Sequence, residues 1–165
     1  MGNIFAASEI VELGIQIEKN GGDFYNTLVT QTKNEKAAAI FKHLAGEEKK
    51  HIAIFQKILE QTEKYEPPKI YADEYLAYMN VLASEYIFTQ KDKGVIEAKK
   101  IKSDKEAVEI GIKFEKDSIL FYEGMKKVVP EYDHKILEEL ILQEQNHLKQ
   151  LADLKKEISF GQKGV

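Results

Sequence analysis

Two stretches of the chain repeat one helical motif: LAGEEKKHIAIF at residues 44–55 and LILQEQNHLKQL at residues 140–151. Each contains a glutamate followed three residues later by a histidine, Glu48 with His51 and Glu144 with His147. Residues three apart on an α-helix project from the same face. Apolar residues at steps of three and four extend this face in both directions, so each motif is predicted to lie on the buried seam of a long helix.

A further glutamate precedes each motif on an earlier helix, and its surroundings are also repeated. Residues 17–25 (IEKNGGDFY) match residues 114–122 (FEKDSILFY), which places Glu18 and Glu115 at equivalent positions. Such internal similarity indicates a duplicated helical hairpin with a pseudo-two-fold axis. The predicted seams are Val11, Gly14, Glu18, Gly21, Tyr25 and Leu28; Ala37, Phe41, Leu44, Glu48, His51, Phe55 and Ile58; Val108, Gly111, Glu115, Ser118, Tyr122 and Met125; and Leu137, Leu140, Glu144, His147, Leu151, Leu154 and Ile158.

The periodicity and the scarcity of proline predict an all-α protein of one domain over residues 1–165. We expect a four-helix bundle of two hairpins, 8–64 and 104–158, joined by a crossover over 66–102 that contains a short helix. Helices are expected over 8–30, 34–64, 73–90, 104–127 and 131–158, and the crossover should end in a Lys-rich polar stretch. Asn34 and Ser103 are predicted N-caps, the latter in a capping box, while Pro67, Pro68 and Pro130 mark turns.

The level of each glutamate along the bundle follows from the turns. Helices joined by a short turn align residues that are equally distant from it. Glu18 and Glu48 lie equally far from the turn at residues 32–34, and Glu115 and Glu144 lie equally far from the turn at Pro130. Each pair is therefore predicted to meet near the middle of the bundle.

Four carboxylates on buried seams call for a cation, because an unpaired buried carboxylate costs several kcal/mol or takes up a proton. No lysine lies on these seams. Carboxylates with two imidazoles suit iron or manganese, with zinc as an alternative, and this set is that of di-iron carboxylate bundles. The predicted ligands of two metal ions are Glu18, Glu48, His51, Glu115, Glu144 and His147. A single Glu-x-x-His would instead be typical of a solvated helix face; the repeat at matching levels favours metal binding.

Three further residues near these seams have weaker signals. Tyr25 and Tyr122 each lie two helical turns after a seam glutamate, where a phenol can hydrogen-bond a ligand carboxylate from a neighbouring helix. The alternative is a plain core tyrosine. Glu85 lies on the apolar side of the crossover helix and is in reach of the site, although a capping or surface role is favoured.

Composition excludes several classes of function. The chain has no cysteine, which excludes disulfides, thiol nucleophiles and iron–sulfur clusters. All its cationic side chains besides histidine are lysines, and the formal net charge is -4, so nucleic acid is not an expected partner. No apolar run approaches the roughly 18 residues of a membrane span, and the first 25 residues include the acidic Glu9, Glu12, Glu18 and Asp23, where a signal peptide would be apolar. We expect a cytoplasmic protein without a membrane partner.

With these motifs, the chain resembles the ferritin-like superfamily, and within it the erythrin domain of rubrerythrins. The resemblance covers nearly the whole length and follows the family's order of ligands. It implies a non-haem di-iron centre that reacts with hydrogen peroxide or oxygen. It also implies that Glu48 and Glu144 bridge the irons, that Glu18 and Glu115 are terminal ligands, and that His51 and His147 each hold one iron.

The resemblance has two departures. Rubrerythrins typically place a further ligand glutamate three residues after the third-helix glutamate, where this chain has Ser118. They also carry a rubredoxin-like domain whose iron is bound by cysteines, so here electrons would come from a separate donor protein. The leading hypothesis is a peroxide- or oxygen-reducing enzyme, expected as a homodimer. The alternatives are a ferroxidase that handles iron and a non-catalytic helical scaffold that binds metal.

Overall fold

The computed structural model describes residues 7–62 and 73–161, and helices make up almost all of this part. The elements in chain order are α1 (Ala7–Gln31), α2 (Glu35–Thr62), α3 (Asp73–Glu85), the 3₁₀-helix η1 (Ile87–Thr89), α4 (Lys93–Lys100), α5 (Asp104–Met125) and α6 (Glu131–Gly161). The described residues contain no strand, so the all-α prediction is confirmed. The predicted stops at Pro67 and Pro68 lie outside the described residues.

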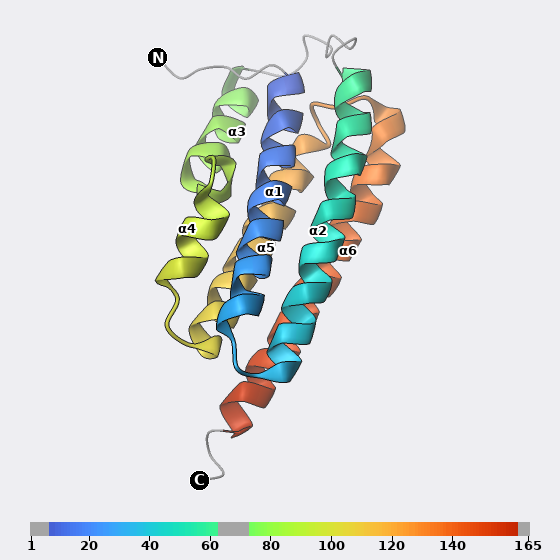
Figure 1. The fold of residues 1–165 in the computed structure, drawn as a ribbon. Coiled ribbons are helices and arrows are strands. Elements are labelled where there is room, and N and C mark those ends of the chain that lie inside the picture. The colour runs from blue at the N-terminus through green and yellow to red at the C-terminus, as the bar shows by residue number, and fades with distance from the viewer. Residues whose placement is uncertain (1–6, 63–72, 162–165) are drawn as a thin grey trace.

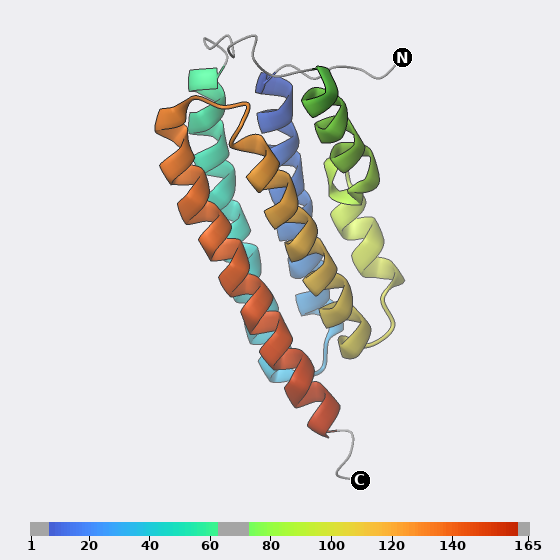
Figure 2. The same cartoon turned by 180° about the vertical axis from the view of Figure 1, so that it is seen from behind.

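Four long helices form the bundle. α1 and α2 pack along each other as one antiparallel hairpin, and α5 and α6 form the second (Figure 1; Figure 2). Contacts between α2 and α6 and between α1 and α5 join the hairpins, so the helices surround a common axis. This arrangement is the predicted four-helix bundle.

Both predicted N-caps are present. The backbone N–H of Ala37 donates to Asn34 Oδ1 at 3.0 Å, and that of Glu106 donates to Ser103 Oγ at 3.1 Å. The Glu106 carboxylate turns back to accept from the backbone N–H of Lys102 at 2.9 Å, one residue before the N-cap. These bonds satisfy N–H groups that have no partner within the helix, and they fix where α2 and α5 begin.

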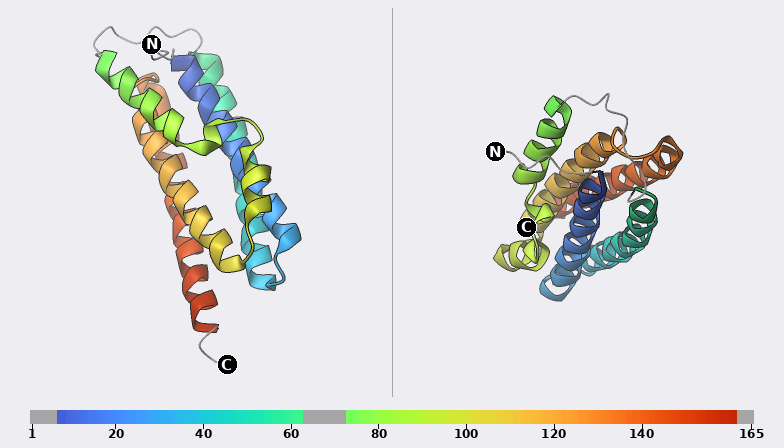
Figure 3. Two further views of the ribbon diagram at one scale, coloured as in Figure 1. Left: turned by 90° about the vertical axis from the view of Figure 1, so that its left-hand side faces the viewer. Right: turned by 90° about the horizontal axis from the view of Figure 1, so that it is seen from above.

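The crossover differs from the prediction of one helix over 73–90 followed by a polar stretch. α3 ends at Glu85, η1 follows, and the Lys-rich segment forms the separate helix α4. α4 is helical because Gly94 and Ala98, one turn apart, are buried against α1, while Lys99 and Lys100 are exposed. A predominantly polar helix therefore needs only a narrow face of small residues to dock. The crossover runs along the outer side of α1 and α5 (Figure 3).

Asn20 and Gly94 fix the position of the crossover. The buried Asn20 amide donates to the carbonyls of Phe88 and Gln90, each at 2.6 Å, and its Oδ1 accepts from the backbone N–H of Gly94 at 3.0 Å. A Cβ at residue 94 would lie 2.0 Å from the Asn20 carbonyl oxygen, so only glycine allows this approach. These hydrogen bonds hold η1 against α1 at Asn20, which lies two residues after Glu18 in the sequence.

The core follows the predicted seams. Every predicted seam residue is buried except Ile158, which is partly exposed. Apolar side chains fill both ends of the bundle. Its middle contains buried polar side chains instead, at the level that the two turns predict.

Candidate metal centre

The six predicted ligand residues come together in the middle of the bundle. α1 contributes Glu18, α2 contributes Glu48 and His51, α5 contributes Glu115, and α6 contributes Glu144 and His147. Each of these side chains belongs to a residue that is at most 4 % exposed. The structure therefore brings together all six, from all four long helices.

The six residues divide into two overlapping clusters. One contains Glu18, Glu48, His51 and Glu144, and the other contains Glu48, Glu115, Glu144 and His147. Within each cluster, one nitrogen or carboxylate oxygen from each residue lies within 4.8 Å of the others. Glu48 and Glu144 belong to both clusters. Two carboxylates shared between two sets, each with its own imidazole, form the donor pattern of a bridged pair of ions.

Both imidazoles direct Nδ1 at the carboxylates. His51 Nδ1 lies 2.8 Å from Glu144 Oε1 and 3.3 Å from the nearest oxygens of Glu18 and Glu48. His147 Nδ1 lies 3.3 Å from Glu144 Oε2, and farther from Glu48 and Glu115 at 3.7 and 3.9 Å. The two rings stack with centroids 5.6 Å apart. Nδ1 is therefore the candidate ligand atom of each histidine.

The carboxylates repel one another in the absence of a cation. Burial, followed by the charge of neighbouring glutamates, raises the pKa of Glu48 and Glu115 well above the ordinary 4.5. Burial also raises the pKa of Glu144. For Glu18, burial acts in the same direction, but hydrogen bonds with Glu48 and His51 outweigh it and lower the pKa.

The two histidines differ in their electrostatic surroundings. Burial alone would lower the pKa of His51, but the carboxylates of Glu144 and Glu18 outweigh it and raise that pKa. Burial lowers the pKa of His147, and the carboxylate of Glu115 does not reverse this. In the metal-free protein the neighbouring carboxylates therefore favour a proton on His51, whereas burial disfavours one on His147.

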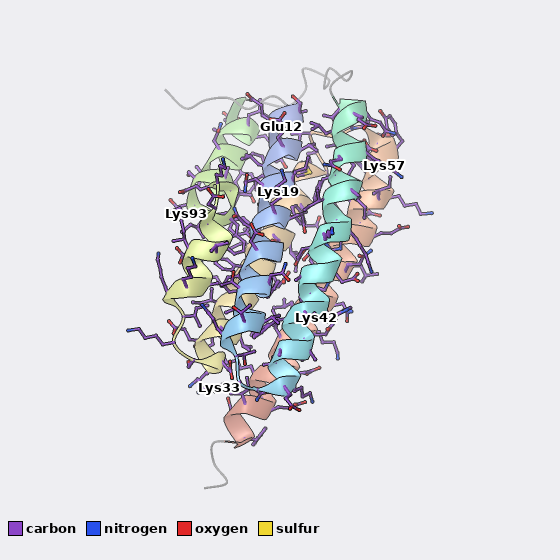
Figure 4. All side chains as sticks on the ribbon, viewed as in Figure 1. Glu12, Lys19, Lys33, Lys42, Lys57 and Lys93 are labelled. Carbon is purple, nitrogen blue, oxygen red and sulfur yellow. The ribbon has the colours of Figure 1, made fainter. Side chains whose placement is uncertain are left out.

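The carboxylate oxygens and imidazole nitrogens at the centre of the clusters suit the binding of metal ions. Glu18 Oε2, His51 Nδ1, Glu144 Oε1 and His147 Nδ1 are buried, and the polar atoms nearest to them belong to the other side chains of the two clusters. The buried polar residues of the described chain include no lysine. Lys19, Lys42 and Lys57 are exposed on α1 and α2 instead (Figure 4). Four carboxylates and two imidazoles that converge in a buried site without a lysine suit two divalent ions.

Two tyrosines tie the hairpins together at the clusters. The Tyr25 hydroxyl of α1 donates to Glu115 Oε1 of α5, and the Tyr122 hydroxyl of α5 donates to Glu18 Oε1 of α1. Both tyrosines are almost completely buried. The hydrogen bonds expected for the two phenols are therefore present. Each fixes one oxygen of a carboxylate and leaves the other free to face the centre.

Sequence reasoning missed residues that surround the clusters. Gln143 Oε1 lies 2.8 Å from His51 Nε2, where it can accept the ring hydrogen and so leave Nδ1 available to a metal ion. A carboxylate oxygen of Glu47 lies within 4.8 Å of nitrogens of both histidines. Both residues directly precede a seam glutamate, but nothing in the sequence separates them from other polar residues. Tyr86 of the crossover was also missed; it contacts Ser118 Oγ at 2.7 Å.

Glu85 does not belong to the clusters. It is the last residue of α3 and is exposed. The next residue, Tyr86, is the one that turns toward the bundle and is buried. The surface role favoured for Glu85 therefore agrees with the structure.

The fold and the clusters define a ferritin-like, carboxylate-rich helical bundle. The rubrerythrin family model matches residues 9–155, and the chain belongs to the rubrerythrin family. A crystal structure of a candidate ferritin-like diiron-carboxylate protein from Thermotoga maritima is similar: it superposes with a TM-score of 0.67 at 27 % identity, over 95 % of this chain and 99 % of that one. No curated protein matches the sequence. Among the described residues, no helix has the length and apolar character that crossing a membrane requires.

Proposed function

We propose that the two clusters bind two iron ions and that the protein reduces hydrogen peroxide, or oxygen, with electrons from a separate donor. The observation that carries this proposal is the sharing of Glu48 and Glu144 between two sets of buried donors, each with one histidine. Membership of the rubrerythrin family supports it. Manganese is the alternative for the same donors, whereas zinc suits them less well because it favours fewer ligands and has no redox chemistry.

Each proposed ligand has a distinct role. Glu48 and Glu144 hold the two ions together, while Glu18 and Glu115 each complete one site. When bound, two ferrous ions supply the two electrons that, with two protons, convert hydrogen peroxide into two water molecules. The chain's own contribution is to orient the ligands through Tyr25 and Tyr122, to exclude bulk water, and to supply carboxyl groups that exchange protons.

The electron donor is proposed to be another protein. The sequence has no cysteine, so this chain cannot bind the iron of a rubredoxin-type site or of an iron–sulfur cluster through thiolates. The homodimer and the cytoplasmic location remain predictions. Sedimentation of the metal-loaded protein at several concentrations tests the first of these.

The decisive experiment compares oxidants. Protein loaded anaerobically with two ferrous ions per chain is mixed in a stopped-flow instrument with equimolar peroxide or oxygen. We expect faster oxidation by peroxide, with two ferrous ions consumed per peroxide. Glu144→Ala, which removes a side chain that both clusters share, should lose this reaction, and Glu139→Ala, at an exposed position on α6, is the matched control that should keep it.

The other outcomes separate the alternatives. Faster oxidation by oxygen, with uptake of many ferrous ions per chain, would assign the protein to iron handling as a ferroxidase. Two bound ions that react with neither oxidant would favour the non-catalytic scaffold. Elemental analysis of protein purified from its native host identifies the metal independently of either reaction.

A further inference from the structure

A small cavity adjoins the candidate metal centre on the side that the crossover covers. Its lining includes Glu18, Glu48 and Glu115 together with Tyr86 and Ser118. Its volume of about 10 Å³ is close to the minimum that holds one water molecule. The cavity therefore has room for a ligand atom the size of oxygen next to three proposed metal ligands.

Tyr86 is a residue of the crossover that lines this cavity. It directly precedes η1, is 4 % exposed, and donates its hydroxyl hydrogen to the Phe114 carbonyl at 3.0 Å. Its ring stacks on Phe88, whose backbone carbonyl Asn20 holds on α1. The position of the Tyr86 hydroxyl is therefore set by the docking of the crossover.

Ser118 forms the other half of a hydroxyl pair. A helical serine ordinarily donates to the carbonyl four residues earlier, which for Ser118 is that of Phe114. Tyr86 already donates to that carbonyl, so the Ser118 hydrogen is free to point to Tyr86 Oη, 2.7 Å away. Serine hydroxyls rotate readily. With a ligand in the cavity, Tyr86 can donate to Ser118 Oγ while Ser118 donates to the ligand.

The other two tyrosines cannot replace this pair. Tyr25 and Tyr122 donate to Glu115 and Glu18, so their hydrogens are already used. Tyr86 instead donates to a backbone carbonyl, and Ser118 donates to Tyr86. Within the described lining of the cavity, they are the hydroxyls that can turn a hydrogen toward a guest without releasing a carboxylate.

We propose that Tyr86 and Ser118 act together as the hydrogen-bond donor for a small anionic oxygen ligand, such as hydroperoxide, in this cavity. The inference rests on the proposed function, because it assigns the place where that oxidant sits. Ser118 contacts the ligand, and Tyr86 is a positioning residue that keeps the Ser118 hydrogen directed into the cavity.

The test measures binding of azide, a non-reacting anion that presents one terminal nitrogen to the cavity. The oxidised, iron-loaded protein is titrated by absorption spectroscopy. We expect Tyr86→Phe and Ser118→Ala each to weaken azide binding about tenfold or more, the usual effect of losing a hydrogen bond to a charged group. Without the Tyr86 hydroxyl, Ser118 would return to the Phe114 carbonyl. The double variant should therefore bind azide no more weakly than Ser118→Ala alone.

Tyr75→Phe is the matched control, because the Tyr75 hydroxyl also reaches from the crossover to α5, where it donates to the Gly124 carbonyl. It should leave azide affinity unchanged. Metal content and circular dichroism establish that each variant is folded and loaded, and Ser118→Ala carries the test if Tyr86→Phe fails to fold. Equal azide affinity in the wild type and Ser118→Ala, or no binding by the wild type, would overturn the proposal. A wild type that binds azide through this pair but reduces no peroxide would refute only the proposed function.

Discussion

Tyr122 on α5 donates its hydroxyl hydrogen to Glu18 on α1, across the boundary between the two hairpins. The same bond runs in the opposite direction from Tyr25 to Glu115. This reciprocal pair of hydrogen bonds follows the internal repeat of the sequence. In each cluster, one carboxylate is therefore oriented by a tyrosine of the opposite hairpin. The centre is thus assembled only when both hairpins pack together.

Tyr122→Phe should weaken metal binding without abolishing it. The substitution keeps the buried ring and removes the hydrogen bond that orients Glu18. Loss of such a partner to a ligand typically lowers metal affinity by about 10- to 100-fold. Anaerobic titration with ferrous ion or zinc measures this, and the effect should fall on one of the two ions. Phe121→Leu, a change in the neighbouring core residue, serves as the control for packing. Equal effects of the two substitutions would contradict an orienting role for the hydroxyl.

Glu48→Ala should reduce the binding of both ions, whereas Glu115→Ala should affect only one. The reason is that Glu48 belongs to both clusters and Glu115 to one. The helical signal should remain in each variant, because removing a buried carboxylate also removes its repulsion with the others. Metal content by elemental analysis, with circular dichroism alongside, checks the result. Glu60→Ala, at an exposed position of α2, should retain both ions. Full metal content in Glu48→Ala would refute the site.

Gly94→Ala should destabilise the protein by undocking the crossover. The added Cβ would meet the Asn20 carbonyl oxygen at 2.0 Å, so α4 has to move away from α1. Overpacking of this kind costs about 1–3 kcal/mol. Gly46→Ala is the matched control, because a Cβ there meets no atom within 4 Å and should stabilise α2 by up to about 1 kcal/mol. Chemical denaturation of both variants gives the comparison. A neutral Gly94→Ala would show that the crossover does not depend on this contact.

The bundle and the six clustered side chains were predictable because they depend on local rules. Helical periodicity places Glu48 and His51 on one face, and a short turn fixes their level relative to Glu18. Neither rule needs knowledge of distant contacts. The sequence therefore predicts which side chains converge, and their binding of metal stays a prediction that the experiments above test.

The surroundings of the centre were not predictable because they depend on how distant segments dock. Tyr86 reaches Ser118 only because Asn20 and Gly94 hold the crossover on α1. Gln143 reaches His51 only because α6 packs beside α2. A single polar residue outside a seam has no periodic signal in the sequence. A Lys-rich segment such as α4 has the composition of a loop, and its helix is explained only by the packing of its small residues against α1.

The metal-free protein should lose stability as the pH rises. Groups whose pKa is raised by folding stabilise the folded state below their unfolded pKa, and this contribution is lost as the pH rises through the folded pKa. Glu48 and Glu115 behave in this way, with pKa values raised well above 4.5, as does Glu144 with a smaller shift. The lowered pKa of Glu18 changes stability only below pH 4.5, and that of His147 opposes the trend below its ordinary pKa of 6.5. The large upward shifts of Glu48 and Glu115 decide the sign, and the raised pKa of His51 adds to the loss above pH 6.5, so stability should fall from about pH 4.5 upward.

Bound metal should reverse this dependence. Metal ions replace the protons, and because the ligands must be deprotonated, binding strengthens as the pH rises. A free metal concentration of a thousand times Kd stabilises the folded state by about 4 kcal/mol, or roughly 10 °C in melting temperature. We therefore expect the melting temperatures of loaded and metal-free protein to differ most at pH 7–8 and to converge near pH 4.5, the ordinary carboxyl pKa. Calorimetry at matched pH values measures both curves. Glu48→Gln should flatten the metal-free curve, since glutamine cannot ionise. Equal melting temperatures with and without iron at pH 7 would contradict a buried metal centre made of carboxylates.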